Sequence, residues 1–222
     1  MIALTRLAAL ALFVAGAAVA AGAPASWDGL VEVKPKRMDA AFLLPGADFR
    51  PYTKMMVDPT QAAFSKDWMK SINDQTRDLS RKVTDEDAAR ILESARANFD
   101  DVFREAFTKA GYEVVSTPGP DVMRVATGVL NLYLNAPDTM SAGRSRTYTT
   151  NAGEATLVIE VRDSMTGALL GRVIDQRETR TSARLQMATS VSNTSDFRML
   201  FRPWAGIATT GLEELKAHSP VP

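Results

Sequence analysis

The chain of 222 residues contains no cysteine and a single histidine, His218. Without cysteine it has no disulfides and no thiolate nucleophile, and both scarcities together argue against a tetrahedral zinc site. A Ser-His-acid triad would depend on His218, which lies in the expected loose C-terminal tail, residues 217–222. The serine-elbow, S-x-x-K, phosphate-loop and dinucleotide-binding motifs are also missing. We therefore predict no metal site and no cofactor, and we assign no catalytic residue.

Neither sign of charge is in excess, and long hydrophobic runs are confined to the start of the chain. Lys and Arg number 26, Asp and Glu also number 26, and the formal net charge is zero. Nucleic-acid phosphates require clustered positive charge, so this balance argues against a nucleic-acid partner. After residue 20, no apolar run approaches the ~20 residues that a membrane-spanning helix needs. The sequence therefore predicts no membrane span.

The first twenty residues have the pattern of a cleaved export signal. Arg6 provides a positive start, residues 7–19 are apolar without interruption, and Ala18-Val19-Ala20 forms a small-x-small cleavage site. We predict a signal peptide over residues 1–20, cleavage before Ala21 and a periplasmic location. Because the chain has no cysteine to accept a lipid, we also expect the mature protein to carry no lipid anchor.

Two segments have the apolar spacing of amphipathic helices. The first, residues 84–110, begins with Thr84 as an N-cap before three acidic residues and ends at Gly111, which suits a helix C-cap. The second, residues 194–216, is interrupted by Pro203, which either kinks the helix or marks its first turn. Phe197, Phe201 and Trp204 lie on its apolar stripe, where aromatic residues form either part of the core or the wall of a ligand groove.

Alternation and turn residues predict the strands. The expected strands are residues 52–57, 112–115, 122–134, 154–162 and 169–175, with a further short extended piece at 61–64 and a partial helix within 68–82. The apolar pattern of residues 122–134 changes phase, which predicts a β-bulge near residues 126–128. Residues 21–40 are expected to be an irregular lead-in, in which Trp27 and Leu30 could dock. The predicted fold is a single α+β domain, residues 41–216, with a mixed, mostly antiparallel sheet of about five strands and two main helices.

Carboxylates and arginines are the remaining candidates for a polar site. Glu154, Glu160 and Asp163 lie on or beside one predicted strand, and two carboxyl groups facing one cleft could act as general acid and base. Glu160 shares a strand face with Arg162, whereas Asp163 points to the other side. The alternative interpretation is a solvated sheet face and a turn-forming aspartate.

Five arginines in two predicted loops, residues 135–153 and 177–195, could form a basic patch for phosphate or acidic partners. They are Arg144, Arg146, Arg177, Arg180 and Arg184. Asp175 and Glu178 lie nearby in the sequence and would dilute such a patch. A solvated loop is therefore the alternative interpretation.

Several short motifs, in order, resemble a known family. They are Leu44-Pro45-Gly46-Ala47-Asp48-Phe49 with Tyr52, then Asp58-Pro59, Phe64 and Trp68, then Gly119-Pro120-Asp121, and finally Asp163-Ser164-Met165-Thr166-Gly167. Over residues 27–216 the chain resembles the domain-of-unknown-function family 3313 of bacterial envelope proteins. The resemblance implies a Gram-negative envelope lipoprotein with no established activity and no catalytic residues to transfer. This chain departs from the lipoprotein pattern because it has no lipid-acceptor cysteine.

Export and the missing catalytic motifs favour a non-catalytic accessory or interaction protein of the cell envelope. Its partner would be another envelope component, bound at a sheet edge or at the polar loops 135–153 and 177–195. The alternative is a periplasmic small-ligand binder, or a hydrolase that uses the carboxylates around Glu160. A concave pocket would favour this alternative, whereas an adaptor can present only a broad surface.

Overall fold

The computed structural model describes residues 26–76, 82–134, 148–149, 153–178, 186–187 and 190–222, so the predicted signal peptide lies outside the described residues. The strands are β1 (Ser26–Trp27), β2 (Leu30–Val33), β3 (Ala40–Leu43), β4 (Lys54–Val57), β5 (Gln61–Phe64), β6 (Glu113–Val114), β7 (Val122–Leu134), β8 (Tyr148–Thr149), β9 (Gly153–Asp163), β10 (Leu169–Glu178) and β11 (Gln186–Met187). The helices are α1 (Trp68–Gln75), α2 (Asp85–Lys109) and α3 (Ser190–Ala217).

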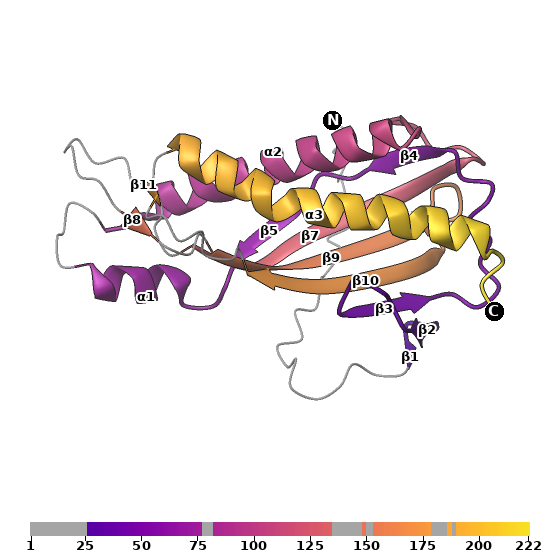
Figure 1. Ribbon diagram of the computed structural model, residues 1–222, viewed down its shortest axis with the longest axis horizontal. Helices are drawn as coiled ribbons and strands as arrows, with labels where there is room; N and C mark the ends of the chain where they lie inside the picture. Colours follow the sequence, from indigo (N-terminus) through magenta and orange to yellow (C-terminus); the bar gives the residue numbers. More distant parts are fainter. Residues whose placement is uncertain (1–25, 77–81, 135–147, 150–152, 179–185, 188–189) are drawn as a thin grey trace, which may run out of the picture.

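Nine strands form one mixed sheet in the order β1-β2-β3-β10-β9-β7-β4-β6, with β5 also pairing with β7. The neighbours along β1-β2-β3-β10-β9-β7 all pair antiparallel. At the other edge of the sheet, β4 and β5 run parallel to β7, and β6 runs parallel to β4. Helices α2 and α3 lie side by side across one face of this sheet (Figure 1). The predicted α+β class with a mostly antiparallel sheet is confirmed, but five strands and two helices understate the observed content. The missed strands are only two to four residues long.

Aromatic side chains from both long helices form the centre of the core. Phe99 and Phe103 of α2 meet Phe197, Phe201 and Trp204 of α3, and each of these side chains is at most 1% exposed. The rings of Phe99 and Phe201 meet edge to face, with 5.1 Å between their centroids. The aromatic stripe of α3 is therefore core.

The start of α2 is where the sequence places it. Thr84 accepts a hydrogen bond from the backbone N–H of Asp87, and the carboxylate of Asp87 accepts one from the backbone N–H of Thr84. This capping box satisfies two backbone donors that the first turn leaves without partners. At the other end Gly111 adopts a φ of 92°, which favours glycine.

Helix α3 runs through Pro203 instead of beginning there. The missing N–H of Pro203 leaves the carbonyl of Met199 without its helical donor. Both residues are exposed, so water can satisfy that carbonyl. Tertiary packing of Phe201 and Trp204 on either side of the proline keeps the helix continuous.

The bulge in β7 is real but lies further along than predicted. Its pairing with β9 slips by one residue between Leu130 and Tyr133, and Asn131 adopts a left-handed φ of 51°. Gly128 instead continues the regular register, opposite Val158. The prediction near residues 126–128 was wrong because it relied on glycine, whereas asparagine also tolerates the left-handed region.

The expected irregular lead-in contains two strands, and the expected loose tail is docked. Leu30 of β2 is fully buried, and the ring of Trp27 meets Phe42 of β3 edge to face at 5.8 Å. At the other terminus, Val221 donates its backbone N–H to Ala47 and accepts one from Gly46, at 2.8 and 2.9 Å. These contacts hold both ends of the described chain against the sheet domain.

Candidate functional site

A cavity of about 490 Å³ lies between the C-terminal half of α3 and the sheet. Its volume is within the ~300–1000 Å³ typical of small-molecule sites. The sheet contributes apolar side chains from β3, β7, β9 and β10, which are Ala41, Leu43, Val125, Ile159, Val161 and Val173. In Figure 1, this half of α3 passes in front of β9 and β10 toward the end of the sheet that carries β3. The cavity is therefore continuous with the hydrophobic core.

One stripe of α3 forms the opposite wall. Ile207, Ala208, Gly211, Leu212 and Leu215 recur at spacings of three and four, which places them on one helix face. Only Leu212 among them is buried, and the other four are partly exposed. A Cβ atom at Gly211 would meet no other group within 4 Å. Two small residues, Ala208 and Gly211, thus leave the space that larger side chains fill elsewhere along the helix.

The loop between β2 and β3 supplies a basic rim. Lys34, Lys36 and Arg37 line the cavity and are exposed to solvent. The Nζ atom of Lys36 lies 3.1 Å from a carboxylate oxygen of Glu214 on α3. Within the described part of the chain, the side chains of Lys34 and Arg37 form no ion pair, which leaves two cationic groups beside an apolar hollow.

The buried carboxylate of Asp175 connects α3 to the sheet through a hydrogen bond. Asp175 of β10 is 4% exposed and accepts hydrogen bonds from the indole N–H of Trp204 at 2.6 Å and from the backbone N–H of Asp39 at 3.1 Å. The Nε of Arg177 donates to the same carboxylate at 2.6 Å. Arg177, a candidate for a basic patch, is therefore the partner of a buried acid. The sequence predicted that Asp175 lies in a strand but did not predict this role. The one indication of it was an acidic residue at a core-facing position of that strand.

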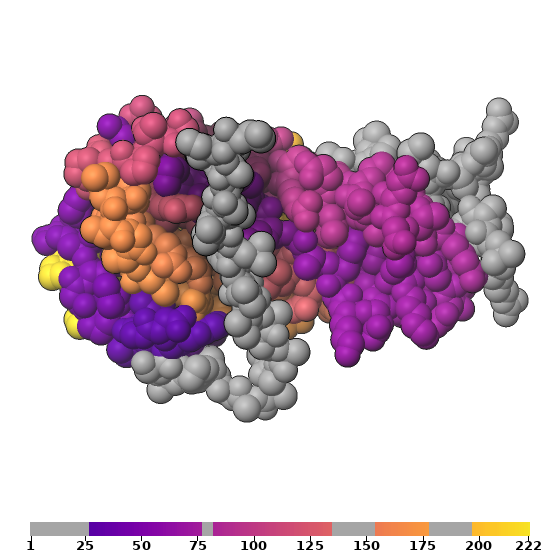
Figure 2. All heavy atoms as spheres, turned by 180° about the vertical axis from the view of Figure 1, so that it is seen from behind, coloured from indigo at the N-terminus to yellow at the C-terminus, as the bar shows by residue number. Residues whose placement is uncertain are grey.

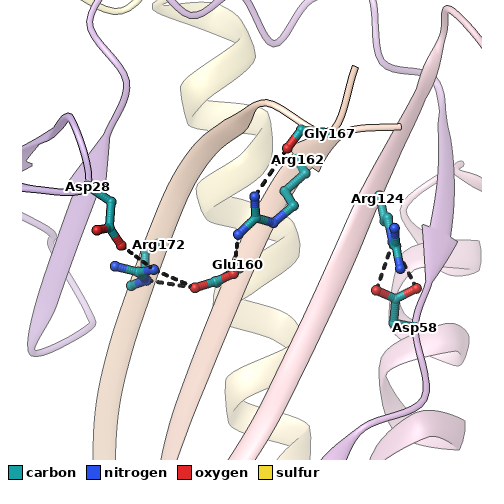
Figure 3. Close-up of polar contacts among 7 residues, drawn as sticks. All are labelled: Asp28, Asp58, Arg124, Glu160, Arg162, Gly167 and Arg172. Atoms are coloured by element: carbon teal, nitrogen blue, oxygen red, sulfur yellow. Dashed lines mark hydrogen bonds and ion pairs between the residues drawn. The ribbon is translucent and has the colours of Figure 1, made fainter. Parts of the chain in front are cut away.

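Glu160 is buried in an ion-pair network instead of lying on a solvated face. It is 9% exposed, and its carboxylate accepts from the guanidinium of Arg172 at 2.6 and 2.9 Å and from Arg162 at 2.9 Å. Arg172 also bonds Asp28 at 2.9 Å and stacks 4.0 Å from the ring centre of Trp27. Figure 3 shows this network on the sheet face away from α3. Both strands that carry it, β9 and β10, lie at the surface seen in Figure 2.

The three candidate carboxylates do not converge. Glu154 lies six residues before Glu160, or ~20 Å along an extended strand. Asp163 has the opposite strand parity to Glu160 and folds into its own turn. Its carboxylate accepts from the backbone N–H groups of Met165 and Thr166 at 3.0 and 2.7 Å, and from the Tyr52 hydroxyl at 2.9 Å. Asp163 is thus the turn-forming aspartate that was the alternative interpretation.

Hydrogen bonding shifts the titration of the Asp163 turn. The backbone N–H of Thr166 is the largest cause that lowers the pKa of Asp163 below its ordinary 3.8, and burial opposes this effect. Burial, with the bond to Asp163 second, raises the pKa of Tyr52 to about 12. At neutral pH, Asp163 is ionised and Tyr52 is protonated. A lowered pKa makes Asp163 a poor proton donor for acid catalysis.

We expect Asp163→Asn to lower the free energy of unfolding in a pH-dependent way. The folded-state pKa of Asp163 lies below its unfolded value, so its ionised form stabilises the fold at all pH values above about 4. That stabilisation is lost as the pH falls through the folded-state pKa. In urea unfolding, the difference between native protein and variant should therefore be constant from pH 7 to 5 and shrink below pH 4. Tyr52→Phe, which keeps the backbone donors, should retain most of this acid dependence, and a difference that grows in acid would refute the assignment.

The remaining candidate arginines, Arg144, Arg146, Arg180 and Arg184, lie outside the described residues. Sequence reasoning missed the cavity. The sequence feature that could have indicated the cavity is the pair of small residues, Ala208 and Gly211, on the apolar stripe of the last helix.

The described residues include no group of three or more acidic or histidine side chains placed to hold a metal ion. In the same residues, no helix has the length and apolarity to cross a bilayer.

Fold and cavity together define an α+β protein with a ligand-sized apolar site beneath its C-terminal helix. The chain belongs to the family of proteins of unknown function DUF3313, whose model matches residues 20–207. This confirms the resemblance that the motifs indicated. No curated protein matches the chain significantly.

Solved structures with a similar arrangement are distant. The PelC dodecamer from Paraburkholderia phytofirmans is 13% identical, with a TM-score of 0.33 over 73% of this chain and 96% of that chain. A Xanthomonas campestris protein of family DUF330 is 11% identical, with a TM-score of 0.35 over 77% of this chain and 90% of that chain. These TM-scores are too low to transfer the assembly or the function of either protein.

Proposed function

We propose that this protein is an exported, non-catalytic accessory protein of the cell envelope that binds an apolar ligand, a lipidic component of the envelope, beneath α3. The cavity of about 490 Å³ between α3 and the sheet is the observation that carries the proposal. Export and release into the periplasm without a lipid anchor rest on the signal pattern of residues 1–20 and on the absence of cysteine.

The cavity walls favour an apolar occupant on energetic grounds. Ile207, Leu215, Val161 and Val173 are only partly buried, although each belongs to an element that packs on the core. Covering such side chains releases about 25 cal/mol for each Å² of apolar surface removed from water. For a linear chain this amounts to ~0.8 kcal/mol per methylene, or about a fourfold gain in affinity per carbon.

Binding is better supported than hydrolysis. The walls are mostly apolar, and the polar lining residues lie on the β2–β3 loop, along the C-terminal part of α3 and just after it, together with Arg172 of β10, which is paired with Glu160. Glu160, the centre of the hydrolase alternative, lies on the other face of the sheet and is already paired with two arginines. Asp163 is held within its own turn. None of the three candidate carboxylates, Glu154, Glu160 and Asp163, lines the cavity.

Binding of 1-alkanols to the purified protein tests this proposal. The fluorescent probe N-phenyl-1-naphthylamine should bind and be displaced by 1-octanol, 1-decanol and 1-dodecanol, with affinity rising about fourfold per carbon. Gly211→Leu should fill the cavity and reduce probe and alkanol affinity by at least about tenfold, since leucine occupies the space that the ligand needs.

Gly206→Leu is the matched control for this substitution. Gly206 lies in the same helix, is exposed and is not a lining residue, and a Cβ there also meets no other group within 4 Å. Both variants gain helix propensity, so both should fold, as circular dichroism will show. Equal probe binding by the two folded variants would contradict the proposal, as would affinity that does not depend on chain length.

A further inference from the structure

We infer that the ligand is a single-chain amphiphile with an anionic head group, whose chain enters the cavity and whose head lies against Lys34 and Arg37. This inference rests on the proposed function and specifies its ligand class. Lys34 and Arg37 project from the β2–β3 loop, which lines the cavity while remaining exposed to solvent. A basic rim beside an apolar interior matches the two ends of such a molecule.

The charge balance at the rim favours an anion. The β2–β3 loop contributes three cationic lining residues, Lys34, Lys36 and Arg37, and Glu214 is the acidic residue among the described lining residues. Arg172 also belongs to the lining, but its guanidinium is paired with Glu160. Glu214 lies 3.1 Å from Lys36, which leaves Lys34 and Arg37 without an acidic partner among the described residues. Elsewhere the arginines of the sheet have acidic partners, as Figure 3 shows for Arg124, Arg162 and Arg172. Two cationic side chains that have no acidic partner among the described residues, Lys34 and Arg37, thus lie beside the cavity.

Hydrogen bonds to β10 hold the second half of the β2–β3 loop in place. Arg37 is anchored through its backbone, because its carbonyl accepts a hydrogen bond from Arg177 at 3.3 Å. The next residues are fixed as well, since Asp39 donates its backbone N–H to Asp175 and accepts one from Gln176 at 2.8 Å. The guanidinium of Arg37 is left available for a carboxylate or phosphate, which it can bind through two parallel hydrogen bonds.

Three ligands of equal chain length separate the head-group effect from the chain effect. Dodecanoate, dodecyl phosphate and neutral 1-dodecanol are titrated below their aggregation limits against the native protein and against Lys34→Glu/Arg37→Glu. We expect both anions to bind native protein on the order of tenfold more tightly than 1-dodecanol. The double variant should lose at least that factor for the anions and change the 1-dodecanol affinity less than about twofold.

Lys66→Glu/Arg104→Glu is the matched control, because it makes the same change in net charge at exposed residues that do not line the cavity. The control should bind all three ligands with affinities within about twofold of those of the native protein. Raising the salt concentration from about 0.05 to 0.5 M should weaken the binding of the two anions and leave that of 1-dodecanol unchanged. The tighter of the two anions identifies the head group as carboxylate or phosphate. Equal affinities for all three ligands would overturn this inference and leave the proposed function standing. If 1-dodecanol itself fails to bind, the proposed function fails.

Discussion

Asp175→Ala is expected to lower the free energy of unfolding by about 3 kcal/mol, because it removes one partner of a buried charged group. The carboxylate is 4% exposed and joins the indole of Trp204, the backbone of Asp39 and the guanidinium of Arg177. Without it, a buried indole N–H loses its acceptor and Arg177 loses its counter-charge. Urea unfolding followed by circular dichroism measures this loss.

Asp175→Asn separates the hydrogen bonds from the charge. The amide oxygen can still accept from Trp204, so this variant should lose clearly less stability than Asp175→Ala, by a difference of about 1 kcal/mol. A loss below about 1 kcal/mol for Asp175→Ala would mean that the carboxylate does not hold α3 on the sheet. The connection matters for the cavity because the same helix forms its outer wall.

Glu160→Ala and Arg172→Ala are each expected to cost about 3 kcal/mol, since each leaves a buried charge poorly compensated. The side chains of Arg172 and Glu160 are 8% and 11% exposed, and their atoms approach to 2.6 Å. Glu160→Ala/Arg172→Ala should cost much less than the sum of the two single losses, because neither charge then stays buried without its partner. Urea unfolding of the four proteins gives the coupling energy directly.

The neighbouring pair Asp58 and Arg124 is the control for this cycle. It lies on the same sheet face (Figure 3), with a closest approach of 2.8 Å, but Arg124 is 47% exposed. Solvent screening should limit its coupling energy to about 1 kcal/mol or less. Coupling of equal size in the two pairs would show that burial does not set the strength of the Glu160 network.

Local signals made the long elements predictable. The capping residue Thr84, the acids that follow it and the terminal Gly111 mark both ends of α2 within a few residues. The alternation of Ala155, Leu157 and Ile159 in β9 correctly assigns the core-facing side of the sheet. In both cases the information lies within a few residues of the feature that it predicts.

Non-local packing explains what the sequence did not reveal. β3 has only four residues and is held by β10, about 130 residues later, so no local period marks it. The apparent exposure of Glu160 followed from alternation, which cannot show that Arg172 comes to lie beside it from the next strand. The cavity depends on Ala208 and Gly211 facing the sheet beneath α3, and a helical period alone does not show whether a neighbouring side chain fills the space they leave.

A nuclear Overhauser experiment between methyl-labelled protein and bound 1-dodecanol tests most directly whether the cavity holds an apolar chain. If the chain lies beneath α3, its protons should give cross-peaks to the methyl groups of Ala208 and Leu215 on α3 and of Val173 on β10, which all line the cavity. Cross-peaks limited to the exposed methyl groups of Met165 and Met199, which are 64% and 52% exposed, would place the chain on the surface and contradict the proposed site.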